Sequence, residues 1–206
     1  MARRTSRDSR NLPLFPLHTV LFPGGMLPLR IFEQRYVDMA KSCLASEGTF
    51  GVVLITSGDE VIRDKAAGAP SFAAVGTEAR IVDWDMPQLG ILHVRTEGLQ
   101  RFSVERHSVA TNGLVTGDVV AIADEPTCAV TQRFVPLVKL LELIAARVGP
   151  QQFPPERRYD DASWVGYRLA ELLPLPLSIK QSMLEINDSE VRLSVLMRFL
   201  SDQGLL

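Results

Sequence analysis

Covalent and metal staples are scarce in this sequence. Only two of its 206 residues are cysteines and three are histidines. Cys43 and Cys128 lie far apart and have apolar neighbours, which is typical of reduced, buried thiols in a cytoplasmic protein. We therefore expect no disulfide, no metal site and no cofactor. A chain of this length does not need such staples, because it buries about 70% of its unfolded surface on folding.

Long hydrophobic runs are also absent. The apolar stretch at 140–146 is interrupted by a charge, and the other apolar stretches are interrupted within a few residues. A helix needs about 20 predominantly apolar residues to cross a bilayer, so we expect no membrane span. The N-terminus lacks the apolar segment of a secretory signal, and we expect a cytoplasmic protein.

Positive charge is concentrated at the N-terminus and is in deficit elsewhere. The whole chain carries a net charge of −2. Four arginines against one aspartate give the first ten residues a charge of +3, which leaves −5 for the remainder. We expect residues 1–11 to form a disordered basic arm, with a weak nucleic-acid contact as its alternative role. The acidic body argues against nucleic acid as a partner of the folded part.

Short β-branched or alternating runs predict a strand-rich part over residues 12–125. One helix is predicted within it, at 33–47, where apolar residues recur at helical spacing before Gly48. Besides the opening stretch, the predicted strands cover residues 50–56, 74–84, 89–97, 99–106 and 114–124. Gly98 is interpreted as a turn between two of these strands, with Arg101 facing solvent.

The hydrophobic period changes from two to about 3.6 after Pro126, which predicts a helical part over residues 126–206. The predicted helices cover residues 134–148, 162–173, a short segment from residue 178, and 189–203. The helix at 134–148 is apolar nearly all round and is expected to be buried. The short helix opens with Ser178 and Gln181 at capping-box spacing. Strands followed by helices indicate an α+β fold.

Prolines interrupt the opening stretch, which reads LPLFPLHTVLFPGGMLPLRIFE at residues 12–33. Proline cannot donate to a strand ladder, so Pro13 and Pro16 predict an edge strand or an extended segment beside the sheet. Pro23 and the two glycines after it predict a tight turn. Pro28 then restarts an extended strand that leads into the first helix.

The same stretch resembles the opening of the N-terminal, substrate-binding domain of the Lon protease family. Three further motifs of that family follow in the expected order: VGTEARI at 75–81, EGLQRF at 97–102, and LAELLPLPLSIKQSMLEINDSEVRL at 169–193. The resemblance covers roughly residues 12–203. It implies a PUA-like β-barrel or folded sheet with one helix, followed by a C-terminal helical bundle.

The catalytic parts of the Lon family have no counterpart in this sequence. A nucleotide-binding P-loop needs the pattern G-x-x-x-x-G-K-[ST], which the sequence does not contain. None of the histidines has a serine in a G-x-S-x-G setting to activate. The acid pairs Asp59 with Glu60 and Asp83 with Asp85 are interpreted as solvated charge. We therefore expect a stand-alone LON substrate-binding domain without catalytic residues, which is not an enzyme.

The resemblance implies a protein-binding function. We expect exposed apolar or unfolded segments of other proteins as ligands, with a separate protease as a further partner. The predicted peptide-binding residues lie at a strand-to-helix junction and at an apolar turn: Arg30, Phe32, Glu33, Arg35, Tyr36, Trp84, Met86 and Leu89. Two alternatives stay open. Phe32 and Tyr36 are core residues in the first, and the protein binds RNA in the second, because PUA-like folds elsewhere bind RNA.

Overall fold

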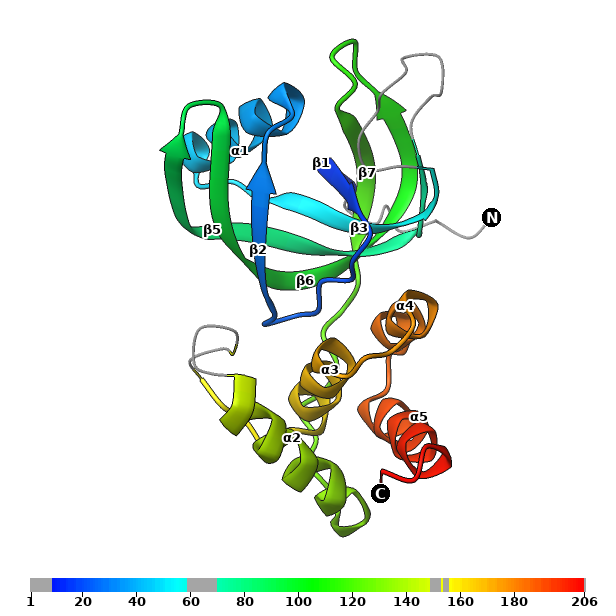
Figure 1. The fold of residues 1–206 in the computed structure, drawn as a ribbon. Coiled ribbons are helices and arrows are strands. Elements are labelled where there is room, and N and C mark those ends of the chain that lie inside the picture. Colours follow the sequence, from blue (N-terminus) through cyan, green and yellow to red (C-terminus); the bar gives the residue numbers. More distant parts are fainter. Residues whose placement is uncertain (1–8, 59–69, 149–152, 154–155, 206) are drawn as a thin grey trace, which may run out of the picture.

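Two parts follow one another along the chain, a strand-rich part and a helical part (Figure 1). The computed structural model describes residues 9–58, 70–148, 153 and 156–205. The strands are β1 (Ser9–Leu17), β2 (Met26–Ile31), β3 (Phe50–Ser57), β4 (Ser71–Phe72), β5 (Val75–Gln88), β6 (Ile91–Val109) and β7 (Val115–Ala121). The helices are α1 (Gln34–Ser46), the 3₁₀ helix η2 (Gln132–Phe134), α2 (Val135–Val148), α3 (Ala162–Leu172), α4 (Leu177–Glu185) and α5 (Ser189–Asp202). The predicted α+β fold class is confirmed.

The sheet closes on itself. Its strands run in the order β1-β7-β6-β5-β3-β4, and β1 also pairs in parallel with β3, which joins the two sides of the sheet into a barrel. Strand β2 lies off this path and pairs with β6. The PUA-like character of this barrel stays a prediction.

Strand β1 is not the edge strand that its prolines predict, because it closes the barrel. Residues 9–14 pair with β7 and residues 14–17 pair with β3. Pro13 lies in the first half of the strand and Pro16 in the second. Each proline therefore has a neighbouring strand on one side only. The side without a strand partner needs no backbone N–H, so a proline is tolerated there.

The start of β1 shortens the predicted basic arm. Residues 9–11, which were expected to be disordered, pair with residues 118–120 of β7. Arg10 also forms an ion pair with Glu78 of β5. The arm prediction is therefore wrong for residues 9–11, and residues 1–8 lie outside the described residues.

One long strand, β6, replaces two of the predicted strands. Gly98 lies within it and is not a turn. Its backbone N–H donates to the carbonyl of Gly25 at 2.8 Å, and its carbonyl accepts from the N–H of Gly24 at 2.7 Å. A Cβ at position 98 would lie 2.2 Å from the carbonyl oxygen of Phe22. Gly98 is therefore the position where the turn after β1 docks on the barrel.

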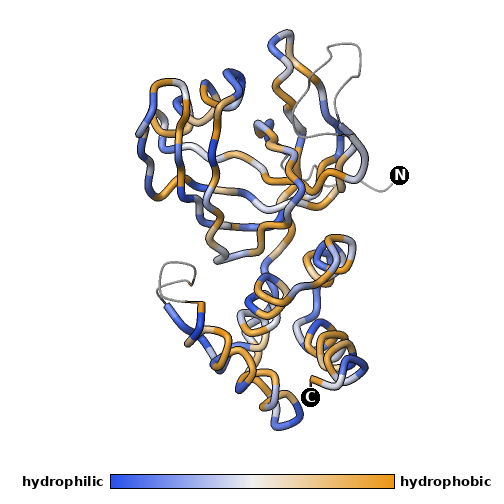
Figure 2. Tube along the Cα trace, in the orientation of Figure 1, coloured by the Kyte–Doolittle hydropathy of each residue, from blue (hydrophilic) through white to orange (hydrophobic). Residues whose placement is uncertain are grey.

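The helical part packs around α3, which is buried along most of its length. Its N-terminus is capped by Asp161, whose carboxylate accepts the N–H of Ser163 at 2.9 Å. Hydrophobic segments run through this part as they do through the barrel (Figure 2).

Helix α2 is less buried than its composition predicts. It buries Leu137, Leu141 and Ala145, whereas Leu143 is 63% exposed. Val138, Leu140 and Ile144 are only partly buried where they pack against the same core, so the helix is covered on the side that meets α3 and not all round. None of the described helices is long and apolar enough to cross a membrane.

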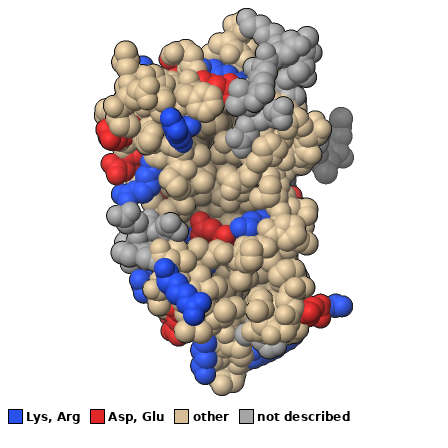
Figure 3. Space-filling view, viewed as in Figure 1, with Lys and Arg blue, Asp and Glu red and all other residues tan. Residues whose placement is uncertain are grey.

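The barrel and the helices share one hydrophobic core. Phe22, Leu54 and Ala73 of the strand-rich part belong to the same buried cluster as the residues of α3. The ring of Phe22 lies 5.8 Å from that of Tyr167, measured between centroids. In the same orientation, acidic and basic side chains meet at the boundary between the two parts (Figure 3).

The close approach at Gly98 generates a first prediction. We expect Gly98→Ala to lower the free energy of unfolding by about 2–3 kcal/mol, because the new methyl group would collide with backbone, which cannot move aside as a side chain can. Gly48→Ala is the matched control, since its Cβ would meet only the flexible Ser46 hydroxyl. Urea unfolding measures both, and equal effects of the two substitutions would contradict the docking role of Gly98.

Candidate functional site

A groove lies between the end of β1, strand β2 and the start of α1, and we call it the β1–β2 groove. Its volume is about 280 Å³. Its walls are mainly apolar, and the residues that line it are Phe15, Leu17, Thr19, Leu27, Pro28, Leu29, Arg30, Ile31, Phe32, Glu33 and Tyr36. The opening proline-rich stretch therefore does more than build the sheet, because it forms both banks of this groove.

Stacked rings support one side of the groove. Tyr36, in the first turn of α1, lies on Phe15 of β1 with ring centroids 3.9 Å apart and planes 20° apart. Glu33 precedes α1 in extended conformation, which turns the chain from β2 into the helix. This wall of the groove is therefore part of the packed core.

Four of the five predicted junction residues line the groove: Arg30, Phe32, Glu33 and Tyr36. Phe32 is 58% exposed, whereas Tyr36 is buried. The core-residue alternative is therefore right for Tyr36 and wrong for Phe32. Both rings nevertheless contribute surface to the same cavity.

Arg35 does not line the groove. Its side chain is buried, and its Nη1 donates to the carbonyl of Gly113 at 2.7 Å, in the turn between β6 and β7. Its Nε donates to Glu33 at 3.1 Å, and its guanidinium lies 4.4 Å from the centroid of the Tyr36 ring. This burial does not fit the predicted peptide-binding role of Arg35, because the residue ties α1 to the barrel.

The predicted apolar turn lies beside the groove and not in it. Trp84 pairs with Val94 of β6, and Val94 pairs on its other side with Leu29 of β2. Trp84 is 56% exposed and Leu89, at the tip, is 94% exposed. Met86 packs against the core beneath α1. The tip and the groove are therefore separated by strand β6 alone. The acid pair of Asp59 and Glu60 lies outside the described residues.

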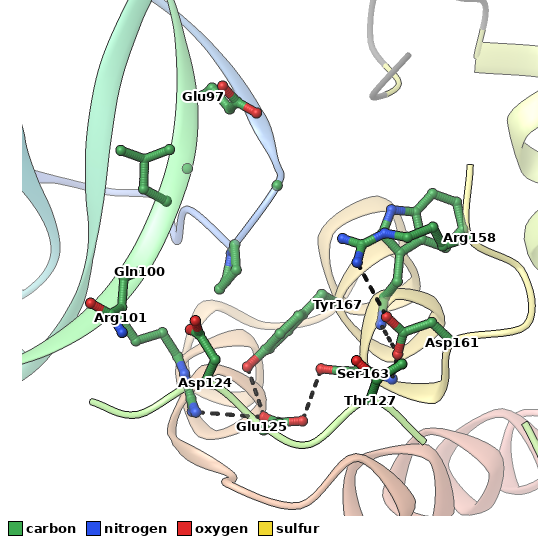
Figure 4. Close-up of a pocket in the computed structure, with 15 residues that line it drawn as sticks. Glu97, Gln100, Arg101, Asp124, Glu125, Thr127, Arg158, Asp161, Ser163 and Tyr167 are labelled. Atoms are coloured by element: carbon green, nitrogen blue, oxygen red, sulfur yellow. Dashed lines mark hydrogen bonds and ion pairs between the residues drawn. The ribbon is translucent and has the colours of Figure 1, made fainter. Parts of the chain in front are cut away.

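A second cavity, of about 430 Å³, lies between the barrel and the helical part (Figure 4). Its lining comes from both parts and from the linker between them: Pro23, Gly24, residues 97–101, Asp124, Glu125, Thr127, Arg158, Asp161, Ser163, Trp164 and Tyr167. We call it the joint cavity. Its chemistry differs from that of the groove, because several of its walls are charged.

Glu125 lies at the centre of these charged groups (Figure 4). Its carboxylate accepts hydrogen bonds from Ser163 Oγ at 2.9 Å and from Tyr167 Oη at 2.8 Å. Both terminal nitrogens of Arg192, which Figure 4 does not draw, also donate to it. Arg101 Nη2 lies 3.6 Å from the same carboxylate. Burial raises the pKa of Glu125, but the hydrogen bonds and the charge of Arg192 outweigh it, so the net shift is downward. Glu125 is held ionised.

Side chains from each part reach the backbone of the other. Arg101 of β6 donates to the carbonyls of Leu184 at 2.7 Å and Ile186 at 3.1 Å. Arg168 of α3 donates to the carbonyls of Pro23 and Gly24 at 2.8 and 2.9 Å. These reciprocal bonds tie the two parts together at their boundary, which we call the joint.

Gln181 adds a further bond across the joint. Its amide donates to the carbonyl of Val75 at 3.0 Å and to Glu185 at 2.8 Å. The predicted capping box is therefore wrong, because α4 follows Pro176 without a side-chain cap and Gln181 points toward the barrel.

Most charges of the joint cavity already have a partner. Glu97 pairs with Arg80 at 2.8 Å, and Arg158 lies 3.5 Å from Asp161. The walls of the β1–β2 groove are mainly apolar and remain open to a ligand. We therefore take the groove as the candidate binding site and the joint cavity as part of the architecture that holds it.

The pattern analysis missed the residues of the joint. Arg101 was interpreted as solvent-facing, yet it is 3% exposed. Arg168 and Arg192 are fully buried, although arginine is almost never buried unless it is paired. The one available signal was their position in mainly apolar helical segments, at 164–173 and 191–200, where a buried charge needs a partner.

Comparison with known proteins adds to this geometry. The family model described as the ATP-dependent protease La (LON) substrate-binding domain matches residues 11–202. The crystal structure of a Lon N-terminal domain protein from Xanthomonas campestris is similar, with 38% sequence identity and a TM-score of 0.75, over 92% of this chain and 98% of that one. The N-terminal domain of a Mycobacterium avium complex Lon protease shares the fold, with a TM-score of 0.62 at 17% identity, over 94% of this chain and 99% of that one.

A full-length relative shows how much of such proteins is matched. The Lon protease of Amoebophilus asiaticus is 24% identical over 208 residues, which is 97% of this chain and 24% of that protein. The chain therefore spans about a quarter of the length of this relative.

The Glu125 network generates a second prediction. We expect Glu125→Gln to lower the free energy of unfolding by about 3 kcal/mol at pH 7, because two buried guanidinium groups lose their counter-charge. Because the folded pKa of Glu125 lies below its ordinary value of 4.5, its contribution is present above that value. It is lost as the pH falls further, so the gap between parent and variant narrows in acid.

Urea unfolding at pH 7 and at decreasing pH measures this gap. Burial raises the pKa of Glu171, which acts in the opposite sense, but Glu171 is common to both proteins and cancels in the difference. Glu97→Gln is the control, because its ion pair with Arg80 is exposed and contributes about 0–1 kcal/mol. A gap that is equally small for both variants, or that does not change with pH, would show that Glu125 does not hold the joint.

Proposed function

Because the chain belongs to the LON substrate-binding domain family, we propose that it is a recognition module for exposed apolar or unfolded segments of other proteins. The observation that carries the proposal is the β1–β2 groove, an apolar cavity with an exposed aromatic residue, Phe32, on its rim. Its role is binding and not catalysis, since the matched family region is a substrate-binding domain.

The walls of the groove suit an apolar side chain. Leu27, Leu29 and Ile31 of β2 face the aromatic and aliphatic side chains of β1 across it. An apolar group that enters such a cavity leaves water, and each methylene buried contributes about 0.8 kcal/mol. This recognition depends on apolar character more than on sequence, as binding to diverse unfolded segments requires.

The rim of the groove carries one residue of each charge, Arg30 and Glu33. Such a rim can pair with charges or backbone groups on either side of an apolar peptide residue. It does not suit RNA, because a phosphate backbone needs several cationic partners and the groove offers a single arginine. The charge of the groove therefore supports protein over nucleic acid.

The exposed tip at Trp84 and Leu89 extends the proposed surface. It lies on the same β5–β6–β2 end of the barrel as the groove. Further apolar parts of the same unfolded protein could contact this tip.

We further propose a separate protease as a partner and a cytoplasmic location. In the relative from Amoebophilus asiaticus the matched region belongs to a Lon protease, and a module of this kind can present bound segments to one. Both cysteines are free thiols, which fits a reducing compartment. Cys43 is buried as expected, whereas the expectation of a buried Cys128 is wrong, because Cys128 is exposed.

The proposal predicts a binding defect at the groove without a folding defect. We expect Phe32→Ala to weaken binding of a reduced and alkylated, permanently unfolded protein by about ten-fold, because an aromatic residue that contacts the ligand often contributes more than 1 kcal/mol to such interfaces. The free energy of unfolding should change by about 0.5 kcal/mol or less, since Phe32 is exposed. Fluorescence anisotropy with the labelled unfolded protein measures the affinity.

Leu143→Ala is the matched control, because Leu143 is equally exposed but lies on α2, in the other part of the molecule. It should bind like the parent. If Phe32→Ala binds as tightly as Leu143→Ala, the groove is not the site. If Trp84→Ala alone weakens binding, the site is the tip.

A further inference from the structure

Strand β2 has one unpaired edge. Within the described residues it pairs with β6 alone, from Met26 opposite Glu97 to Ile31 opposite Leu92. Over the same stretch, β6 uses its other side to pair with β5. Strand β2 is therefore the outer strand of a β5–β6–β2 sheet, and its second edge presents backbone N–H and C=O groups without a strand partner.

This free edge borders the β1–β2 groove. Side chains of a strand alternate between its two faces, so a cavity on one face of β2 would contact every second residue. The groove instead contacts every residue from Leu27 to Phe32. A cavity that contacts six consecutive residues runs along the edge of the strand. The backbone of β2 and the apolar bank formed by β1 therefore face the same space.

We propose that the bound segment lies extended along the free edge of β2 and adds a strand to the β5–β6–β2 sheet. This inference rests on the proposed function, because it states how the client of the groove is held. Main-chain hydrogen bonds to β2 provide affinity that does not depend on sequence. Every second side chain of the client then points toward the apolar bank that contains Phe15, Leu17 and Tyr36.

The composition of β2 limits what can pair with it. Pro28 has no N–H to donate, and Arg30 is exposed on the strand. Proline and charge are the usual means by which an edge strand avoids pairing with another copy of itself. An antiparallel pair of two β2 strands would bring both of these residues from each copy into one short ladder. The occupant is therefore an apolar segment of another protein and not a second copy of this chain.

Backbone N-methylation of a peptide tests the proposal without altering the protein. The probe is a labelled nine-residue peptide of alternating leucine and threonine, with a lysine at each end for solubility. Two further versions are N-methylated at all leucines or at all threonines, which removes the donors of one edge of the strand and leaves every side chain in place. The parent protein and the Phe32→Ala variant are titrated with all three.

We expect at least one methylated peptide to bind about ten-fold more weakly than the unmethylated one, which corresponds to the loss of one or two main-chain hydrogen bonds. Binding of both methylated peptides within two-fold of the unmethylated one would overturn strand addition and leave the groove as a side-chain pocket. Failure of the unmethylated peptide to bind, or equal binding to Phe32→Ala, would overturn the proposed function itself.

Sedimentation of the protein without peptide tests whether a second copy of this chain occupies the edge of β2. A monomer is expected. A dimer that the unmethylated peptide dissociates would show that a second copy occupies the edge, and would overturn the assignment to another protein.

Discussion

The carboxylate of Glu125 is the group on which the placement of the two parts depends. It lies in the linker after β7 and compensates guanidinium groups from both sides, Arg101 of the barrel and Arg192 of α5. A buried ion pair adds little stability over well-packed apolar residues, but removing one partner is expensive because the other charge is left uncompensated. We infer that this network mainly fixes one arrangement of barrel and helices. The β1–β2 groove then has one position relative to the helical part.

The motifs that carry the family resemblance contribute residues to this joint. The glycines of the FPGG turn lie against Gly98 of the EGLQRF motif, and a Cβ at Gly25 would lie 2.6 Å from the carboxylate of Glu171, in the third motif. The segment from 169 to 193 also supplies Arg192 to Glu125. The residues that carry the resemblance therefore mainly determine how the two parts pack together. The groove depends on a short portion of the opening stretch, where the chain turns from β2 into α1.

Periodicity predicted the order of strands and helices, because alternation and the 3.6-residue period are local properties of the chain. It failed where residues from a distant segment of the chain determine the environment of a residue. Gly98 resembles a turn residue until the turn after β1 is seen to dock on it, and Arg101 alternates like a surface residue although α4 and the linker cover it. Helix α2 has enough apolar residues to be buried all round, but only one side of it meets other helices. At the junction, sequence order alone could not separate Phe32, which is exposed, from Arg35, whose helix position directs it to the β6–β7 turn.

The groove and the joint have different proposed roles, and the chemistry of the two cavities differs in the same way. The joint cavity is lined largely by charges that pair with one another, whereas the groove is lined mainly by apolar groups and by the edge of β2, which has no second strand partner among the described residues. The most direct measurement is the map of backbone amide shifts in nuclear magnetic resonance spectra when an extended apolar peptide is added. We predict that the shifts concentrate in residues 27–36 and in Phe15 and Leu17. Shifts that concentrate around residues 97–101 and Glu125 instead would place the ligand in the joint cavity and contradict the assignment of the groove.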